Sequence, residues 1–551
     1  MMAKPFLLYL HTLRYLRPVQ IYGRLWFRLY RPRPDLSSIP APRHASGRWV
    51  MPARRQASMI APRRFVFLGQ AHELVDSTGW NQPERDKLWL YNLHYFDDLN
   101  ADRATERYDW HRALITDWIA DNPPGQGNGW ESYPLSLRIV NWIKWALAGN
   151  ALAPAELHSL AVQIRYLRRR LEWHLLGNHL FANAKALVFA GLFFQGEEAA
   201  AWLQQGLSIL RREVPEQILP DGGHFERSPM YHSIILDDLL DLINLARLYP
   251  GQVSVQQLDN WYESVARMSV WLQTMCHPDG QIALFNDAAF DIAPAPAELF
   301  SYAERLAVHN NKRLNRTSSG NLIQLPESGY LRWQRGPVVA LLDAAPIGPD
   351  YLPGHAHADT LSFELSFYGQ RVVVNGGTSC YGNSQERLRQ RGTAAHSTVV
   401  VDGQDSSEVW GGFRVARRAY PEILQLQYMD DQLHIECAHE GYRRLPGRVR
   451  HRRQWLFNDK TLQVIDCLDG CFDSAQAYFH LHPDIVVQSD EPPQTGWFLL
   501  PDGQRMRWQV NMGNATIESS TYHPRFGQHQ PNHCLVVQLS SAQSQVCFTW
   551  T

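Results

Sequence analysis

The sequence predicts an α+β protein with two large domains, an all-α domain followed by an antiparallel β-sandwich. Three observations support this prediction. The 551-residue chain is too long to fold around a single hydrophobic core. From about residue 85 to 312, apolar residues recur every three or four positions, which is typical of amphipathic helices. After Ser328 and Gly329 the apolar period changes to two, as expected for strands.

The helical domain is expected over residues 85–315. Turn signals such as Pro220–Gly223 separate its apolar runs, which indicates several antiparallel helices. Two of these runs are clear, and their members are Leu157, Leu160, Ile164, Leu167 and Leu171, and Ile235, Leu239, Leu242, Leu245 and Tyr249.

The sandwich domain is expected over residues 316–551. Hairpin signals such as Asn458–Asp459 and Asp402–Gly403 interrupt the alternating runs. Many short strands over about 220 residues indicate a large antiparallel sandwich. The strand-like runs are Val338–Leu342, Arg371–Val374, Thr398–Val401, Leu462–Ile465 and Leu535–Leu539.

Residues 1–84 are expected to form a basic, Pro/Arg-rich N-terminal arm, with residues 31–64 as an extended connector. The net charge of the whole chain is only -1, yet residues 1–70 carry thirteen Lys or Arg and one acid, Asp35. A basic arm with interleaved aromatics can contact an anionic membrane or a polyanionic glycan. An arm wrapped on an acidic body explains the charge equally well. We expect no nucleic-acid partner.

Cysteine spacing and apolar runs restrict the class of protein further. The seven cysteines show no paired spacing, so no disulfide framework is expected. Phe6–Leu10 is too short for the apolar core of a cleavable signal peptide. No run of about 18 apolar residues occurs, so we expect no membrane-spanning helix.

The segment Gly354–Thr360, Gly-His-Ala-His-Ala-Asp-Thr, directly precedes the alternating run Leu361–Phe367. In a strand, residues two apart point to the same face, so His355 and His357 are expected to share one site. Such a pair can hold a metal, move a proton or divide these tasks. A hydrogen-bonded pair beneath a loop is the alternative.

Three stretches in the helical domain carry polar groups where the periodic pattern would place apolar ones. They are Asn128–Pro134, Gly177–Asn183 and Gly222–His232. An asparagine at a helix entry is commonly a cap, and loop aromatics can fill helix ends instead of stacking on a sugar. None of the three identifies a function when taken alone.

Taken together, these stretches resemble the heparinase II/III family of polysaccharide lyases, to which related alginate lyases also belong. The resemblance spans residues 85–480, and the matching motifs occur in the family's order. They are Gly177–His179, Glu226–Tyr231, Gly354–Asp359, Asn375–Thr378 and Thr393–Thr398. The resemblance implies an incomplete α/α toroid followed by an antiparallel β-sandwich. It also implies cleavage of a uronic-acid-containing anionic polysaccharide by β-elimination.

The resemblance assigns catalytic roles to Asn178, His179, Tyr231 and His355. β-Elimination removes the C5 proton next to the uronate carboxylate and expels the oxygen on C4. A neutral donor must stabilise the charge that develops on the carboxylate, and the amide of Asn178 matches that role. Tyr231 can act as acid or base, and His355 with His179 can supply the complementary group. The sequence leaves open which residue takes the proton.

Further residues are predicted to contact substrate or metal. Trp130, Glu131 and Glu226 are candidates for substrate contact, and Arg389 and Arg391 can grip a carboxylate or sulfate. The resemblance implies a structural zinc bound by His357, Asn375 and His396, although the family has an aspartate at position 375 and an amide is a poorer zinc ligand. A hydrogen-bonded cluster of these three residues is the alternative. No organic cofactor is expected.

Three other functions use part of the same pattern. A uronate C5-epimerase abstracts the same proton without expelling the C4 oxygen. A glycoside hydrolase would need a carboxylate pair, with Glu131, Glu226, Asp237, Asp238 and Asp359 as candidates. A glycan-binding component of a polysaccharide assembly system would need no proton-transfer groups. The family resemblance indicates a periplasmic or cell-envelope location.

Overall fold

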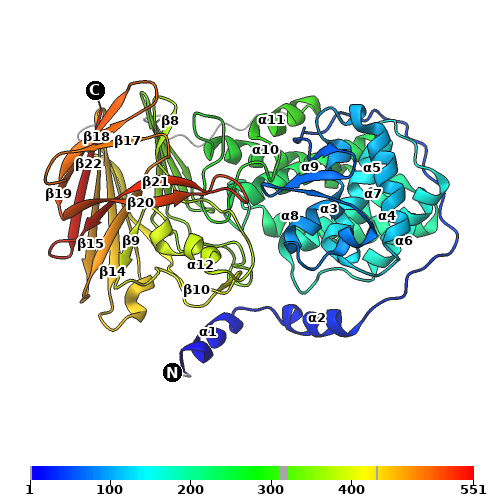
Figure 1. Ribbon diagram of the computed structural model, residues 1–551, viewed down its shortest axis with the longest axis horizontal. Helices are drawn as coiled ribbons and strands as arrows, with labels where there is room; N and C mark the ends of the chain where they lie inside the picture. The colour runs from blue at the N-terminus through cyan, green and yellow to red at the C-terminus, as the bar shows by residue number, and fades with distance from the viewer. Residues whose placement is uncertain (1–2, 309–320, 430–431, 551) are drawn as a thin grey trace.

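The computed structural model describes residues 3–308, 321–429 and 432–550. Figure 1 shows two domains side by side, one built of helices and the other of sheets. The change from helix to strand therefore falls where the apolar period changes. The predicted boundary between residues 315 and 316 lies outside the described residues.

The helical domain is an incomplete toroid of packed helices around a core rich in buried tryptophan. Its central contacts join α5 to α7, α7 to α8 and α9 to α10. Local sequence fixes where helices begin, because Ser228 caps the backbone N–H of Tyr231 at 3.2 Å and Pro229 starts α9. The helices are α3 (Lys87–Tyr95), α4 (Tyr108–Asp121), α5 (Ser132–Leu147), α6 (Pro154–Arg168), α7 (Gly177–Phe193), α8 (Glu197–Gln217), α9 (Pro229–Leu248), α10 (Val255–Thr274) and α11 (Pro296–Arg305).

The second domain is an antiparallel sandwich with two packed layers. One layer is an eight-stranded sheet in the order β12-β13-β14-β15-β22-β19-β18-β17. The other holds the sheets β20-β21-β16-β9 and β4-β5-β6-β7-β8, which the bridge between Val373 and Leu481 joins. Trp455 and Val464 of the first layer share one core with Leu365 and Phe479 of the second. Alternate residues of β14 and β15 are buried, which is the predicted period of two.

The strands follow the chain in short segments joined by turns. In the second layer they are β4 (Leu322–Leu325), β5 (Tyr330–Arg335), β6 (Val338–Asp343), β7 (Phe363–Phe367), β8 (Gln370–Val373), β9 (Val399–Val401), β16 (Ala475–His480), β20 (Asn514–Tyr522) and β21 (Gln530–Gln538). In the eight-stranded sheet they are β12 (Pro421–Met429), β13 (Gln432–His439), β14 (Arg450–Phe457), β15 (Thr461–Asp469), β17 (Val486–Ser489), β18 (Thr495–Leu499), β19 (Arg505–Met512) and β22 (Gln543–Thr549).

The N-terminal region is more ordered than the arm that the composition predicts. Two helices, α1 (Ala3–Leu13) and α2 (Pro18–Leu29), lie along one edge of the molecule (Figure 1). A small sheet of β1 (Met59–Ala61), β2 (Arg64–Phe67) and β3 (Gln70–Glu73) then packs on the helical domain through buried Phe65. The intervening stretch is extended, as predicted, and pairs Arg43 N with Phe193 O at 2.7 Å.

Within the described residues, no helix has both the length and the apolar content needed to cross a membrane.

Candidate active site

Tyr231 and His355, which come from different domains, lie in ring contact. Their ring centroids are 3.9 Å apart. Tyr231 lies in the first turn of α9, whereas His355 lies in the loop between β6 and β7. The Tyr231 hydroxyl is 3.0 Å from the hydroxyl of Tyr381, so a second phenol completes this contact. A phenol and an imidazole therefore meet at the junction of the two domains.

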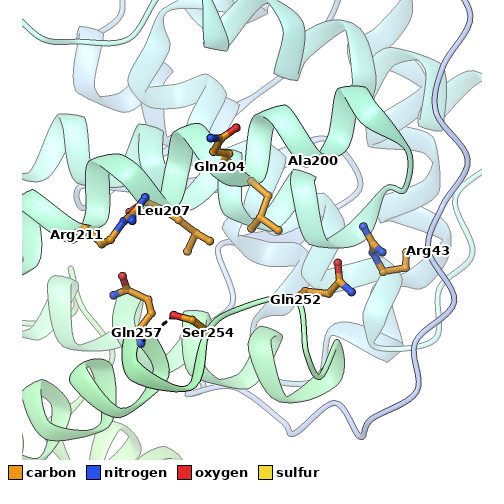
Figure 2. A pocket seen from close by; sticks show the side chains of 9 residues that line it. Arg43, Ala200, Gln204, Leu207, Arg211, Gln252, Ser254 and Gln257 are labelled. Atoms are coloured by element: carbon orange, nitrogen blue, oxygen red, sulfur yellow. Dashed lines mark hydrogen bonds between the residues drawn. The ribbon is translucent and has the colours of Figure 1, made fainter.

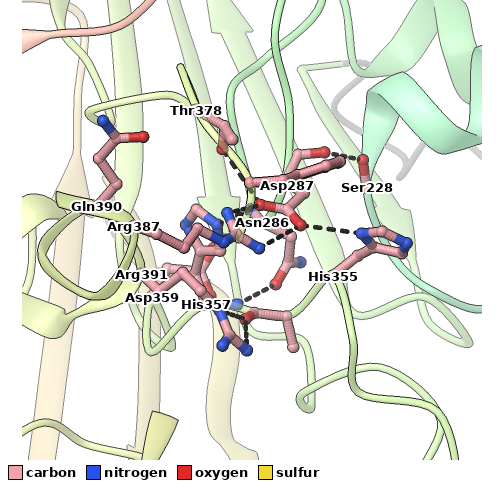
Figure 3. A network of polar contacts seen from close by, with 12 residues as sticks. Ser228, Asn286, Asp287, His355, His357, Asp359, Thr378, Arg387, Gln390 and Arg391 are labelled. Carbon is pink, nitrogen blue, oxygen red and sulfur yellow. Dashed lines mark hydrogen bonds and ion pairs between the residues drawn. The ribbon is translucent and has the colours of Figure 1, made fainter. Parts of the chain in front are cut away.

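The buried carboxylate of Asp287 holds both histidines of the Gly354–Asp359 segment (Figure 3). One oxygen lies 2.9 Å from His355 Nδ1 and the other lies 2.8 Å from His357 Nε2. Arg387 binds the same carboxylate with two guanidinium nitrogens, one of them at 2.7 Å. Although burial opposes ionisation, Arg387 and the two imidazoles hold the pKa of Asp287 well below its ordinary value. Asp287 is thus an anion that fixes two rings.

This arrangement sets the tautomer of His355. An ionised carboxylate can only accept hydrogen bonds, so Nδ1 of His355 carries the proton and donates it to Asp287. The other nitrogen, Nε2, is then free to accept a proton. Burial lowers the pKa of His355 and Asp287 acts against that shift, so the ring is neutral near pH 7. His355 therefore has the properties of a general base.

Tyr231 has the opposite character. Burial raises the pKa of its phenol well above the ordinary value, and the neighbouring Tyr381 and Asp287 raise it further. The hydroxyl is consequently protonated near pH 7. Next to a neutral imidazole, this phenol can give a proton to a leaving oxygen.

Glu226 lies beside the same imidazole and is buried. Its Oε2 is 3.8 Å from His355 Nε2. Neither carboxyl oxygen has a hydrogen-bond partner among the residues that the structure describes. Burial, with a smaller contribution from Asp287, raises the pKa of Glu226 to about 8. A neutral carboxylic acid therefore faces the site and can donate a hydrogen bond.

Asn178 and His179 approach the site at the N-terminus of α7. A Cβ atom placed on the preceding Gly177 would lie 3.1 Å from Glu226 Oε1, so this helix end adjoins Glu226. Asn178 is nearly buried, whereas about a third of the His179 side chain is exposed. The ring of His179 packs on Tyr133 with centroids 4.6 Å apart, and its Nδ1 lies 3.2 Å from Glu172. Glu226 thus lies between His355 and the N-terminal end of α7, which bears Asn178 and His179.

A cavity of about 390 Å³ opens beside this cluster, and Tyr133, Tyr231 and Tyr381 are among the residues that line it. Most of its charged residues form ion pairs, whereas Asp97 accepts a hydrogen bond from Asn141 at 2.7 Å. Arg55 binds Asp237 at 3.0 Å, and Lys185 binds Asp238 at 2.7 Å. The cavity therefore presents phenols and amides beside Tyr231, and those two aspartates are engaged by cations.

A separate cavity of about 350 Å³ lies between α8 and α10 (Figure 2). Its lining includes Arg43, Gln204, Arg211 and Gln257. None of the predicted site residues is in that lining, so this cavity adds nothing to the cluster around Tyr231.

The predicted zinc ligands lie together, although they do not complete a zinc site. His357 Nδ1 is 3.2 Å from His396 Nε2, a separation that one zinc ion could bridge. The amide of Asn375 is engaged elsewhere, since it donates to Ser362 at 3.3 Å and accepts from Ser397 N at 3.3 Å. Among the described residues, no group of three His, Cys, Asp or Glu could hold a metal. The donor set therefore does not fit a closed four-ligand site, and zinc stays a prediction.

His355 and His357 share the partner Asp287, but not because they lie on one face of a strand, as the sequence predicts. Strand β7 begins only at Phe363, so the two histidines lie in a loop and the strand period does not apply. They meet because the two oxygens of Asp287 draw both rings inward. His355 then faces Tyr231, whereas His357 faces His396.

Two predicted substrate contacts need correction. Trp130 is 4 % exposed, donates its indole N–H to Asn122 O at 3.2 Å and packs between Trp118 and Tyr166, so it belongs to the core. Arg391 is fully buried and donates to Ala356 O at 2.9 and 3.0 Å. It braces the loop that bears the two histidines and does not face solvent.

Two other predicted contacts stay accessible but are already paired. Glu131 lies 2.9 Å from Lys87 and also binds the Tyr91 hydroxyl. Arg389 lies on the helix α12 (Gln385–Arg391) and pairs with Glu386.

Four residues of the cluster were not found by reasoning from the sequence. Asp287 and the neighbouring Asn286 are polar residues within the apolar run Ile282–Phe290, and that interruption was the available signal. Arg387 lies two residues before Arg389, and Tyr381 follows the Asn375–Thr378 motif. Neither of these has a spacing that distinguishes it from a surface residue.

The sequence matches two models of one protein family, which together cover most of the chain. A model described as Heparinase II/III N-terminus matches residues 79–308, and one described as Heparinase II/III-like, C-terminal, matches residues 317–551. A crystal structure of heparinase III superposes with a TM-score of 0.67 at 16% identity, over 96% of this chain and 88% of that chain. A mutant of heparan sulfate lyase HepC from Pedobacter heparinus gives a TM-score of 0.60 at 20% identity, over 96% and 87%. These likenesses show the fold.

Sequence relatives carry two different names. A heparin-sulfate lyase of Bacteroides stercoris is 25% identical over 354 residues, which cover 60% of this chain and 50% of that protein. FtsZ-localized protein C of Caulobacter vibrioides is 25% identical over 469 residues, which cover 78% of this chain and 77% of that protein. The chain spans about half the length of the heparin-sulfate lyases that it matches.

Proposed function

Because the chain belongs to the heparinase II/III family, we propose that it is a polysaccharide lyase that cleaves a uronic-acid-containing anionic polysaccharide by β-elimination. The observation that carries the proposal is the contact between a protonated phenol, Tyr231, and a neutral imidazole, His355, whose Nε2 is free. Matched relatives named heparin-sulfate lyases support the substrate class.

The two residues divide the proton transfers of the reaction. His355 Nε2 takes the proton from C5, and the electrons of the broken C–H bond form the C4–C5 double bond. The C4–O bond breaks at the same time, and Tyr231 gives its proton to the departing oxygen. Asp287 favours the first step, because its negative charge stabilises the imidazolium that forms.

The uronate carboxylate needs neutral donors, because removing the C5 proton adds negative charge next to it. The side-chain amide of Asn178 can donate to this group, and the protonated carboxyl of Glu226 can donate a second hydrogen bond. His179, the more exposed of the two residues at this helix end, can contact the sugar from the rim. No step of this scheme requires zinc.

A hydrolase is a weaker alternative on this geometry. Asp237 and Asp238 are ion-paired with Arg55 and Lys185, so they are not free to act as an acid and a nucleophile. An epimerase would use the same His355 and Tyr231, and a pure glycan binder would use neither. From the family resemblance we also propose, as a separate hypothesis, a periplasmic or cell-envelope location.

The test is a panel of uronate polymers incubated with the full chain. We expect at least one polymer to be cleaved with a new ultraviolet absorbance from a C4–C5 double bond in the product. Cleavage without this absorbance would indicate hydrolysis. Deuterium uptake at C5 without cleavage would indicate epimerisation, and binding without either change would leave a glycan-binding protein. Each of these three results would overturn the lyase assignment.

A further inference from the structure

Helices α1 and α2 place a row of large apolar side chains in solvent. Ile21, Tyr22, Leu25, Trp26 and Leu29 share the outer face of α2, where Trp26 is 61% exposed and Leu29 is 81% exposed. On α1 the exposed set is Phe6, Leu7, Tyr9, Leu10 and Leu13, with Phe6 67% exposed. One edge of this set, Tyr9, also packs on Trp410, with ring centroids 4.8 Å apart. Both helices lie along the same edge of the molecule (Figure 1). Contiguous exposed apolar surface of this kind marks an interaction site.

The opposite faces of these helices are docked on the body of the protein. Gln20 donates to Tyr351 O at 3.0 Å, and the ring of Phe27 packs on His174 with centroids 4.2 Å apart. Thr12 of α1 lies 3.1 Å from Trp410 Nε1, which belongs to the sandwich domain. Because Gln20, Phe27 and Thr12 contact the body, the apolar row is held outward in a fixed orientation.

Arginines flank the apolar row on α2. At helical spacing, Arg24 and Arg28 fall on one side of the row. Arg17, which precedes the helix, is engaged by Glu216 and Tyr351 of the body. Arg24, Arg28 and Arg31 also line, with Arg170, a cavity of about 550 Å³ whose lining contains no acidic residue. A pocket of this composition suits a phosphate group. Two arginines of this cationic pocket, Arg24 and Arg28, lie on the same short helix as the apolar row.

We propose that α1 and α2 form a membrane-docking surface that lies in the plane of an anionic phospholipid bilayer. The apolar row enters the boundary between headgroups and acyl chains, and the arginines contact lipid phosphates. A basic amphipathic helix with an apolar face made of Trp, Leu and Ile has the composition that such docking requires. The proposal is independent of the lyase assignment, since none of these residues touches the cluster around Tyr231.

A polyanionic glycan fits this surface less well. A glycan would engage the arginines, but it would leave Ile21, Leu25 and Leu29 in water. A bilayer accommodates both the charge and the apolar row. The two partners are therefore separable by variants that remove one property at a time.

The test is co-sedimentation of the full chain with vesicles of neutral lipid alone or with about 30% phosphatidylglycerol, in about 0.15 M salt. We expect binding to the anionic vesicles to be at least about tenfold stronger than to the neutral ones. A double variant, Leu25→Glu with Trp26→Glu, should lose this binding by a similar factor. Val255→Glu is the matched control, because Val255 is an exposed apolar residue on α10.

Lyase activity on soluble substrate is the second readout, and it should be unchanged in the double variant. Three results would overturn the proposal. They are no binding to anionic vesicles, equal binding by the double variant and the wild type, and a loss of binding with Val255→Glu as large as that of the double variant. If Arg24→Ala with Arg28→Ala weakens binding to heparin while vesicle binding is absent, the arm is a glycan site instead.

Discussion

Asp287 and His355 are joined by a 2.9 Å hydrogen bond between the carboxylate and Nδ1 of the ring. Asp287 comes from the loop after α10 and His355 from the loop before β7, so the bond ties the helical domain to the sandwich. It orients the imidazole and leaves Nε2 toward Glu226 and the Tyr231 side of the site. The second oxygen of Asp287 binds His357 and Arg387, so one carboxylate organises the whole cluster.

Replacing Asp287 should damage both catalysis and folding. We expect Asp287→Asn to lower kcat by about 10²–10⁴-fold, because an amide can no longer fix the His355 tautomer. Stability should fall by about 3–5 kcal/mol, because Arg387 is left buried without its anion. Steady-state kinetics and urea unfolding measure the two effects. Asp291→Asn is the control, and loss of its partly exposed pair with Arg525 should cost at most about 1 kcal/mol. Equal effects of the two variants would contradict this account of Asp287.

Tyr231→Phe should abolish turnover and preserve substrate binding. Loss of the proton donor is expected to lower kcat by about 10²–10⁴-fold, while the ring contact with His355 is retained. Tyr381→Phe keeps the Tyr231 hydroxyl, so its effect should be much smaller. Turnover and isothermal titration with an oligosaccharide separate the two quantities. If Tyr231→Phe cleaves at the wild-type rate, Tyr231 is not the acid.

Glu226 should make the protein less stable as pH rises. Its pKa is about 8 in the fold and about 4.5 in the unfolded chain. Between these values the folded state binds the extra proton, so this contribution to stability declines from about pH 4.5 to pH 8. Glu226→Gln removes the titration. Urea unfolding should therefore show the variant gaining stability relative to wild type at pH 8.5 but not at pH 4.

Glu304→Gln provides the comparison for that experiment, because Glu304 is exposed on α11. We expect the pH-dependent difference from wild type to be larger for Glu226→Gln than for this exposed-site variant. A parallel pH dependence in the two variants would show that the carboxyl of Glu226 is not held neutral.

The zinc prediction can be tested through Asn375. A carboxylate at this position would add an anionic third ligand to the two imidazoles of His357 and His396. We expect Asn375→Asp to bind zinc about tenfold or more tightly than wild type, measured by competition with a chelator. His396→Ala should remove the added affinity. Unchanged affinity in Asn375→Asp would mean that these residues do not form a zinc site.

Trp130 should behave as a core residue. Trp130→Ala is expected to cost about 3–5 kcal/mol of stability, because the indole is enclosed by Trp118 and Tyr166. Trp26→Ala, at an exposed position on α2, should change stability by less than about 1 kcal/mol. Chemical unfolding of both variants tests this. A Trp130→Ala protein of wild-type stability with a raised KM would restore the sugar-stacking role.

The sequence predicted the two domain types and the convergence of Tyr231 with His355. Apolar periodicity distinguishes helix from strand over long stretches, and family motifs mark residues that are distant along the chain. Asp287 was missed because one aspartate in an apolar run has no partner at a fixed spacing. Trp130 and Arg391 were misassigned because residue type does not reveal burial. The role of Asp287 depends on how loops from the two domains meet. The burial of Trp130 and Arg391 depends on packing within one domain, and apolar periodicity encodes neither.

The position of β22 affects how the sandwich forms during synthesis. This last strand lies inside the eight-stranded sheet, between β15 and β19. Until it leaves the ribosome, β12–β15 and β17–β19 are two separate groups of strands, each with an unpaired edge. Such edges can pair with other chains, so the nascent sandwich is exposed to aggregation until its final strand arrives.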